Sequence, residues 1–378
     1  MNVIHMKIAY DHQIFGLQKH GGISRYFAEL VENLRADPEI QPTVIAPVHI
    51  NEYLRRNAIA DKVIGRYLPF DFRGKGRIAR AMNKALVPLA WLGQSHDIIH
   101  ETYYSKSPRG AARVRVLTIY DMIHELYPEE IPDSAQVIRA KRAAARRADH
   151  IICISETTRD DACQILGISP DNVSVIHLGC SLDGGLTTQS ICDTVDPFVL
   201  YVGHRGGYKN FRVVLEAFGS SKVIGRDVRL VAFGGPRFSI SEEVEIRQFG
   251  LDGRVLWTSG DDAKLRAYYR AAIAFVYPSR YEGFGIPPLE AMAAGCPVVC
   301  STAPSITEVV GNAAAFFAPD DSGYLKTLIE RVVHDGKYRD ELRAKGAQCV
   351  SRYSWARCAA ETRALYLRLA DRRKLAAV

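Results

Sequence analysis

The sequence predicts an α/β protein composed of two Rossmann-like domains, each with a parallel sheet and crossover helices. Short apolar, β-branched runs alternate with longer segments of helical periodicity along nearly the whole chain. Such alternation is typical of βαβ units, whose strands pair in parallel. It occurs as two sets, separated by a polar, glycine-rich segment over residues 181–190. A chain of 378 residues is long enough for two full hydrophobic cores.

The first set of strand candidates indicates a domain over residues 1–184. The candidates are residues 8–10, 43–46, 98–99, 114–119 and 151–154. Gly21 and Gly22 follow the first strand and precede a helical pattern over residues 23–34, so the backbone there could approach a phosphate or a sugar closely. Arg25 could add a cation. A plain tight turn is the alternative explanation of the glycine pair.

The second set indicates a domain over residues 191–352. Its strand candidates are residues 198–202, 229–232, 255–257, 274–277 and 297–300. Ligands of open α/β sheets bind beyond the carboxyl ends of the strands. Two facing domains would therefore enclose a cleft in which a donor on one domain meets an acceptor on the other.

The most informative motif runs from Tyr277 to Glu290 and reads Tyr-Pro-Ser-Arg-Tyr-Glu-Gly-Phe-Gly-Ile-Pro-Pro-Leu-Glu. It predicts Glu282 in a loop and Glu290 in the first turn of the following helix, whose prolines suit a helix start. A helix start attracts phosphate. Carboxylates beside an anion site suggest hydroxyl binding, on a sugar for Glu282 and on a ribose for Glu290. Alternatively, Glu290 complements the helix dipole and Glu282 is a solvated loop charge.

Two cations follow the predicted strand at residues 198–202. Arg205 and Lys209 lie four residues apart in a glycine-rich segment. The sequence contains no Asp-x-Asp, so a route in which a metal shields a departing diphosphate has no obvious ligand set. The protein would then have to supply fixed cations, and arginine and lysine offer a planar fork and a point charge. Two ordinary surface charges are the alternative.

These motifs resemble the retaining GT-B glycosyltransferases of family four, whose Glu-x7-Glu signature is matched by Glu282 and Glu290. The resemblance extends over nearly the whole chain and is most similar to the mannosyltransferase-B-like branch of polysaccharide and O-antigen biosynthesis. Further segments in the family's order are residues 6–11, 21–26, 151–158, 175–179, 200–205 and 353–355. The resemblance implies an N-terminal acceptor-binding domain, a C-terminal nucleotide-sugar-binding domain, and a final helix at about 356–372 that packs back on the first domain.

The resemblance also implies roles for individual residues. Catalytic roles fall to Glu282, Arg205, Lys209 and Asp121. Donor contacts fall to Gly22, Arg205, Lys209, Glu282, Gly283, Phe284, Gly285, Ile286 and Glu290. The chain departs from the family at Tyr120-Asp121, where relatives usually have His-Asp, with the histidine near the transferred sugar. Tyr120, His124 and Arg25 are therefore expected acceptor or sugar contacts, although a lone histidine is often a satisfied loop residue.

The implied function is metal-independent transfer of a sugar, with retained anomeric configuration, to a polysaccharide or a polyprenyl-diphosphate-linked oligosaccharide. Mannose from GDP-mannose is the expected donor, and no cofactor is expected. We favour front-face transfer, in which the departing phosphate oxygen helps to deprotonate the acceptor. Alternatives are a UDP-sugar-dependent transferase, a phosphorylase or sucrose-synthase-like enzyme, and a catalytically silent sugar-nucleotide-binding subunit.

The net charge of +7 is concentrated in the N-terminal half, where residues 55–147 contain 18 Lys/Arg and 9 Asp/Glu. An anionic lipid surface or a diphosphate-linked acceptor explains this excess better than nucleic acid, for which no motif is present. Over residues 72–91, Ile78, Met82 and Leu86 recur at helical spacing beside basic residues, which predicts an apolar face with a cationic rim. The alternative is that this apolar face packs into the domain.

We expect a cytoplasmic protein that associates peripherally with the inner face of the membrane. The sequence shows no 18-residue apolar run and no export signal. Its eight cysteines are scattered singly, which favours a reducing compartment.

Overall fold

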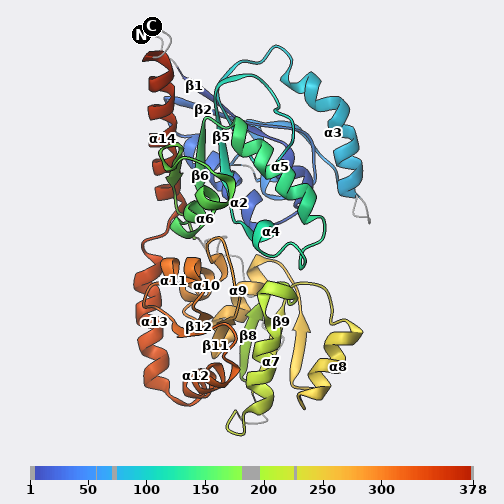
Figure 1. The fold of residues 1–378 in the computed structure, drawn as a ribbon, viewed down its shortest axis with the longest axis vertical. Helices are drawn as coiled ribbons and strands as arrows, with labels where there is room; N and C mark the ends of the chain where they lie inside the picture. Colours follow the sequence, from blue (N-terminus) through green and yellow to red (C-terminus); the bar gives the residue numbers. More distant parts are fainter. Residues whose placement is uncertain (1–4, 57, 70–74, 181–195, 225–227, 376–378) are drawn as a thin grey trace. The chain divides into compact units, whose positions relative to one another are not determined.

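The computed structural model describes residues 5–56, 58–69, 75–180, 196–224 and 228–375. The chain divides into two compact units. Unit 1 comprises Met1–Pro128, Pro132–Gly179 and Trp355–Val378, and unit 2 comprises Glu129–Ile131 and Cys180–Ser354. Each unit has its own parallel sheet with flanking helices (Figure 1), which confirms the predicted α/β class. The glycine-rich segment at residues 181–190 lies outside the described residues.

Unit 1 contains a seven-stranded parallel sheet in the order β3-β2-β1-β4-β5-β6-β7. Its strands are β1 (Met6–Asp11), β2 (Ile40–His49), β3 (Val63–Tyr67), β4 (His96–Glu101), β5 (Ala112–Ile119), β6 (His150–Cys153) and β7 (Val173–Val175). Its helices are α1 (Gln13–Leu17), α2 (Gly22–Leu34), α3 (Lys75–Trp91), α4 (Ile123–Leu126), α5 (Ser134–Arg147), α6 (Glu156–Leu166) and α14 (Trp355–Leu375), with short 3-10 turns η1 (Tyr53–Arg55), η2 (Ala60–Lys62) and η3 (Pro170–Asn172).

The crossover direction assigns the helices of unit 1 to the two faces of the sheet. The chain moves one way along the sheet from β1 to β2, and the opposite way from β3 to β4, β5 to β6 and β6 to β7. Because such crossovers are right-handed, α3, α5 and α6 cover one face and α2 covers the other. The final helix α14 packs against α2 on that second face (Figure 1).

Buried polar groups attach α14 to the rest of unit 1. The Tyr366 hydroxyl lies 2.6 Å from Nδ1 of His100 and 3.3 Å from the hydroxyl of Tyr10, and all three side chains are buried. Arg363 forms ion pairs with Asp37 and Glu39. A Cβ added at Gly179 would lie 2.3 Å from the backbone nitrogen of Trp355, so only glycine allows this approach at the start of α14.

Unit 2 contains a six-stranded parallel sheet in the order β10-β9-β8-β11-β12-β13. Its strands are β8 (Phe198–Val202), β9 (Arg229–Phe233), β10 (Val255–Thr258), β11 (Ala274–Tyr277), β12 (Val298–Ser301) and β13 (Ala315–Phe317). Its helices are α7 (Phe211–Ser220), α8 (Ile240–Gln248), α9 (Asp262–Ala271), α10 (Ile286–Ala293), α11 (Pro304–Val310), α12 (Ser322–His334) and α13 (Gly336–Val350), and η4 (Gly207–Lys209) is a 3-10 turn.

The central strands of unit 2 read as nearly continuous apolar runs because helices cover both faces of a parallel sheet. All four residues of β11 are buried, as are all four residues of β12. Strand order reverses between β8 and β11, since the chain runs outward from β8 to β9 and β10 on one side and from β11 to β12 and β13 on the other. The loops that follow β8 and β11 therefore meet at a topological switch point, where ligands of open α/β sheets bind.

Candidate active site

Lys209 and Glu282 form an ion pair at the switch point of unit 2. The Lys209 Nζ lies 2.6 Å from Glu282 Oε1, although the residues are 73 positions apart in the sequence. Lys209 ends the η4 turn after β8, and Glu282 lies in the loop after β11. Their side chains are 20% and 10% exposed, so solvent still reaches the pair. Two predicted site residues are thus brought together at a partly open, charged position.

The turn that presents Lys209 is fixed by the next residue. Asn210 adopts a left-handed backbone conformation with φ of 55°, which asparagine tolerates better than most residues. Its buried carboxamide donates hydrogen bonds to the carbonyls of Pro278 at 3.3 Å and Pro319 at 2.6 Å. The bond to Pro278 ties the loop after β8 to the loop after β11, and the bond to Pro319 ties it to the segment after β13, so Lys209 is held opposite Glu282.

Arg205 is placed differently from Lys209. Its side chain is only 2% exposed, and its Nε donates to Glu242 Oε1 at 2.6 Å. The two terminal nitrogens donate to the carbonyls of Gly234 at 3.3 Å and Pro236 at 2.6 Å, and the guanidinium stacks on Phe238. Each guanidinium nitrogen therefore already has a partner inside unit 2. An anionic ligand would have to compete with Glu242 for this cation.

Glu242 is a strong competitor. It is the third residue of α8 and completes a capping box with Ser239. Burial opposes its ionisation, but hydrogen bonds from Arg205 and Ser239 hold the pKa of Glu242 below its ordinary value. The carboxylate is therefore charged at neutral pH, and the pair with Arg205 persists there.

The predicted donor loop leads into α10, which begins at Ile286. Gly285 precedes it with φ of 111°, a conformation that requires glycine. Glu290 is half-buried and is the fifth helical residue, so it lies just past the first turn rather than inside it as predicted. Burial, and next the charge of Glu290, raise the pKa of Tyr269 well above its usual value.

The other residues of this loop are buried. Gly283 and Phe284 both lie below the surface, and the Phe284 ring packs edge-on against Tyr353 with 5.7 Å between ring centroids. The Ser305 hydroxyl donates to the backbone carbonyl of Glu282. The side chain of Glu282 therefore projects from a backbone that this hydrogen bond holds in place.

In unit 1, Tyr120 and Asp121 lie in the loop after β5, and His124 lies in the short helix α4 that follows. Tyr120 is 4% exposed, and its hydroxyl donates to the carbonyl of Thr102 at 2.9 Å. That hydroxyl is used in a buried hydrogen bond, so Tyr120 is not placed to take over the role of a substrate-facing histidine. Asp121 is half-buried and accepts a hydrogen bond from the Ile123 N–H at 3.2 Å. His124 is half-buried, and burial lowers its pKa.

The predicted glycine loop of unit 1 starts α2 at Gly22. The side chain of Gln18 caps this start, since its Oε1 accepts a hydrogen bond from the Ser24 N–H at 3.1 Å. One donor of the helix start is therefore already occupied. Arg25 lies further along α2, with its Nε 4.0 Å from Glu29.

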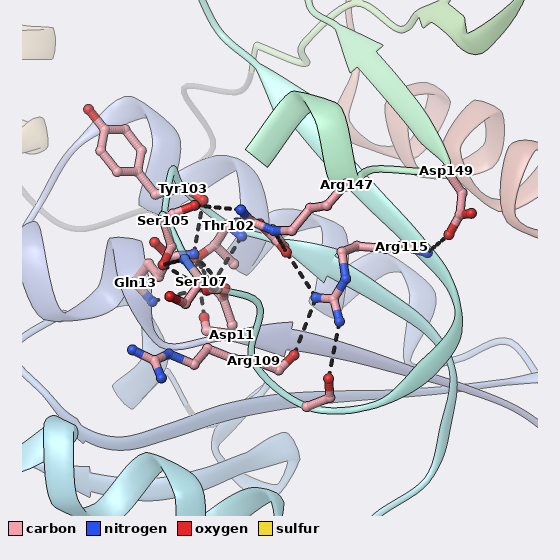
Figure 2. Close-up of polar contacts among 12 residues, drawn as sticks. Asp11, Gln13, Thr102, Tyr103, Ser105, Ser107, Arg109, Arg115, Arg147 and Asp149 are labelled. Carbon is pink, nitrogen blue, oxygen red and sulfur yellow. Dashed lines mark hydrogen bonds and ion pairs between the residues drawn. The ribbon is translucent and has the colours of Figure 1, made fainter. Parts of the chain in front are cut away.

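Sequence reasoning missed a buried polar network at the carboxyl ends of β1 and β4. Figure 2 shows Asp11, Gln13 and Thr102 converging: Asp11 accepts hydrogen bonds from the Thr102 hydroxyl at 2.5 Å and from Gln13 Nε2 at 2.7 Å. Nearby, Arg115 and Arg147 both pair with the buried Glu101. A charged residue at the end of an apolar strand, as Glu101 is at the end of β4, was the available signal.

Lys141, on α5, was also missed. It is completely buried and contacts the loop that carries Asp121.

Among the described residues, no group of three His, Cys, Asp or Glu side chains is arranged to hold a metal ion. No helix in the described part of the chain is long and apolar enough to span a bilayer.

Comparisons with known proteins agree with this architecture. Residues 20–183 match the family described as Glycosyltransferase Family 4, and residues 189–348 match Glycosyl transferases group 1. An O-antigen chain mannosyltransferase B from Escherichia coli is 29% identical over 56% of this chain and 58% of its own length. The O-antigen chain mannosyltransferase RfbU of Salmonella typhimurium is 25% identical over 58% of this chain. The chain thus matches less than two thirds of these relatives, 58% and 61% of their lengths.

Among solved structures, HepE from Anabaena in complex with UDP and glucose aligns with a TM-score of 0.70 and 19% identity, over 96% of this chain and 99% of that one. This likeness concerns the fold. The two family matches together cover most of the chain, from residue 20 to residue 348. The chain therefore belongs to the GT-B glycosyltransferases of group 1 and family four, as its motifs predicted.

Proposed function

We propose that this chain transfers mannose from GDP-mannose to a polysaccharide or polyprenyl-diphosphate-linked oligosaccharide, with retention and without a metal. The observation that carries the proposal is the Lys209–Glu282 pair at the switch point of unit 2. A partly exposed cation beside a carboxylate matches a donor that carries both a diphosphate and sugar hydroxyls. The names of the O-antigen relatives support mannose as the sugar.

In this proposal, Lys209 stabilises the charge that grows on the diphosphate as the bond from sugar C1 to phosphate oxygen breaks. Glu282 accepts a hydrogen bond from a hydroxyl of the reacting sugar, and Glu290 from the ribose. The acceptor oxygen bonds to C1 on the face that the phosphate leaves, and its proton passes to the departing phosphate oxygen. Arg205 acts indirectly, because its ion pair with Glu242 fixes the loop between β9 and α8.

For the acceptor side we propose Asp121 and His124 of unit 1, with Arg25 as a further contact. Asp121 is partly open to solvent, with a side chain 25% exposed. Tyr120 is left out because its hydroxyl already donates to Thr102.

A thermal-shift screen of GDP, UDP, ADP and dTDP tests the donor base, since a ligand of the native state raises the melting temperature. We expect GDP to give the largest shift. Transfer from GDP-mannose to a polyprenyl-diphosphate-linked oligosaccharide would then be followed by NMR of the anomeric proton, with and without EDTA. An inverted product, or activity that EDTA abolishes and magnesium restores, contradicts the proposal. Nucleotide binding without turnover points to a silent subunit.

A UDP-sugar donor is the second candidate, because the similarly folded HepE was solved with UDP and glucose. A larger thermal shift with UDP than with GDP would favour it.

We further propose that α3 docks reversibly on an anionic membrane surface, close to a lipid-linked acceptor. Its inward face is Ala79, Asn83, Val87 and Trp91, all buried. Asn83 ties this face to β2 by accepting from the Val48 N–H at 3.0 Å and donating to the Val48 carbonyl at 2.8 Å. The outward residues Ile78, Met82, Leu86 and Leu89 are 43%, 42%, 37% and 67% exposed. These four residues are therefore outside the core of unit 1, which supports the docking proposal over the alternative in which the stripe packs into the domain.

Cations border this apolar stripe. Arg77, Arg80 and Lys84 are exposed on α3, and residues 72–74 of the predicted segment lie outside the described residues. On α5, which covers the same face of the sheet, Arg139, Arg142 and Arg146 are exposed. None of these three arginines forms an ion pair with another described residue. Pro88 lies inside α3, which continues to Trp91.

Vesicle co-sedimentation tests this docking. Each basic residue near an anionic surface contributes about 1 kcal/mol, so we expect binding to phosphatidylglycerol vesicles but not to phosphatidylcholine vesicles, with loss at high salt. Arg77→Glu with Arg80→Glu and Lys84→Glu should abolish it. A matched control changes the exposed lysines 222, 337 and 345 of unit 2 to glutamate. Equal loss in both triple variants would contradict a docking role for α3.

A further inference from the structure

Lys141 is an unusual lysine, because no part of its side chain reaches solvent. Lysine is almost never fully buried unless it is paired. Its Nζ lies 2.7 Å from Glu125 Oε2 and 2.8 Å from the backbone carbonyl of Asp121. The same nitrogen is 3.9 Å from Asp121 Oδ1 and 5.2 Å from the centre of the Tyr104 ring. One buried cation therefore contacts both ends of the segment 121–125.

The charges in this cluster do not cancel. One lysine faces two carboxylates, and these differ in exposure: the Glu125 side chain is 4% exposed and the Asp121 side chain is 25% exposed. Glu125 is the closer partner and is desolvated together with Lys141. The excess negative charge therefore lies on Asp121, the carboxylate that faces solvent.

The surrounding groups belong to the same electrostatic cluster. Burial, followed by the charges of Asp121 and Glu125, raises the pKa of Tyr103 to about 12. Burial lowers the pKa of His124, and the Lys141 charge lowers it further while Asp121 and Glu125 oppose this effect. Tyr103, Tyr104, His124 and Lys141 are thus the titratable neighbours of the two carboxylates.

We propose that Lys141 is a positioning residue for glycosyl transfer: by holding the Asp121 carbonyl and pairing with Glu125, it fixes residues 120–125 so that the Asp121 carboxylate faces the acceptor. This inference rests on the acceptor role proposed above for Asp121. Lys141 itself, being fully buried, does not touch substrate. A displacement of about 1 Å in a substrate-orienting group can cost a factor of about 100 in rate, so the loss of this anchor should be visible in kinetics.

The test separates positioning from simple structural support. Lys141→Met leaves Glu125 buried without a partner and should lower stability as well as activity. Lys141→Met combined with Glu125→Met removes both buried charges, so we expect stability to return. The Asp121 carbonyl still lacks its donor in this double variant. We therefore expect kcat/KM for the acceptor to stay about tenfold to a hundredfold below wild type, with GDP binding unchanged.

Gln136→Met, at an exposed position of α5, is the control and should keep wild-type kinetics. The inference is overturned if the double variant recovers both stability and activity, or if Lys141→Met keeps wild-type kcat/KM for the acceptor. Should neither methionine variant fold, Glu125→Gln decides, because it retains Lys141 and its bond to Asp121. Activity within about threefold of wild type supports the inference, and a loss above tenfold overturns it.

A readout without turnover separates this inference from the proposed function. In Lys141→Met, an NMR titration of the His124 ring should show a raised pKa, because a neighbouring cation has been removed. If wild type transfers no sugar, the proposed function fails. The titration would still test whether Lys141 lies beside His124. An unchanged His124 pKa in Lys141→Met would contradict that position.

Discussion

The carboxyl edges of the two sheets use buried charge in opposite ways. In unit 1 the cation Lys141 is sealed and the carboxylate Asp121 reaches solvent. In unit 2 the cation Lys209 is partly exposed and the carboxylate Glu282 is nearly buried beside it, while Arg205 is buried in an ion pair with Glu242. A charged residue just beyond a strand is therefore not a ligand contact merely by position. A residue placed to bind a ligand differs from one that supports the fold in its exposed fraction and in how far its polar atoms are already bonded within the protein.

Lys209→Ala should reduce activity at the unit 2 site more than any other substitution discussed here. It removes a fixed cation from the place where charge develops, and we expect kcat/KM to fall by about 100-fold to 1,000-fold. The melting temperature should change little, because the side chain is partly exposed and Asn210 fixes the turn. Steady-state kinetics with GDP-mannose measures the effect. Lys222→Ala, an exposed lysine of the same unit, is the control.

The two glutamates of the donor motif should separate kinetically. Glu282→Gln is expected to lower kcat by about tenfold to a hundredfold while changing the donor KM little, because Glu282 is assigned to the reacting sugar. Glu290→Gln should chiefly raise the donor KM. Initial rates over a range of GDP-mannose concentrations distinguish the two. An unchanged kcat/KM in either variant removes that residue from the site.

Arg205→Ala tests whether Arg205 supports the fold of unit 2, in contrast to Lys209, which is assigned to the donor. Its loss removes the donor to the Pro236 carbonyl and the cation that pairs with Glu242, and we expect a destabilisation of about 1 to 3 kcal/mol in urea unfolding. Arg212→Ala is the matched control. Arg212 pairs with the carboxylates of Glu216 and Glu245, but its side chain is 66% exposed, so its loss should cost less than about 1 kcal/mol. Equal stability of the two variants would argue against a supporting role for Arg205.

Acid should affect the two units over different pH ranges. Burial lowers the pKa of His100 to about 3, so His100 is neutral in folded unit 1 and binds a proton on unfolding below its ordinary pKa of 6.5. Unit 1 should therefore lose stability progressively as pH falls from about 6.5 toward 3. The Glu242 pKa is lowered from 4.5, so its contribution to unit 2 is lost only at lower pH.

Replacing His100 with asparagine tests this pH dependence. We expect a shallower decline of stability between pH 6.5 and 4 than in wild type, measured by thermal unfolding across that range. The same slope in both proteins would mean that another group causes the decline.

The sequence predicted the central strands well and the edge strands poorly. Strand β11, for example, is a continuous apolar run because helices cover both faces of a parallel sheet. The missed strands are β3, β7 and β13. Strand β7 has only half-buried residues, β3 is mostly exposed at the edge of its sheet, and β13 has three residues. Such strands are defined by hydrogen bonds to a neighbour, which local composition does not reveal.

Prediction of the site followed the same division. Lys209 and Glu282 were identifiable because each follows a clear apolar strand. The partner of Arg205 was not, since Glu242 lies 37 residues away and starts a different helix. Lys141 occurs in an Arg- and Ala-rich segment where it resembles a solvated charge. Only the fold shows that Lys141 turns inward while Arg139, Arg142 and Arg146 turn outward.

Hydrogen–deuterium exchange with and without GDP-mannose tests the central claim, that the donor binds at the Lys209–Glu282 edge of unit 2. We expect the donor to protect amides of residues 203–210 and 282–290 in wild type, and to leave residues 120–126 of unit 1 unchanged. The protection should disappear in Lys209→Ala and persist in Lys222→Ala. Donor-dependent protection confined to residues 120–126, or protection of residues 203–210 and 282–290 that survives Lys209→Ala, would contradict the assignment.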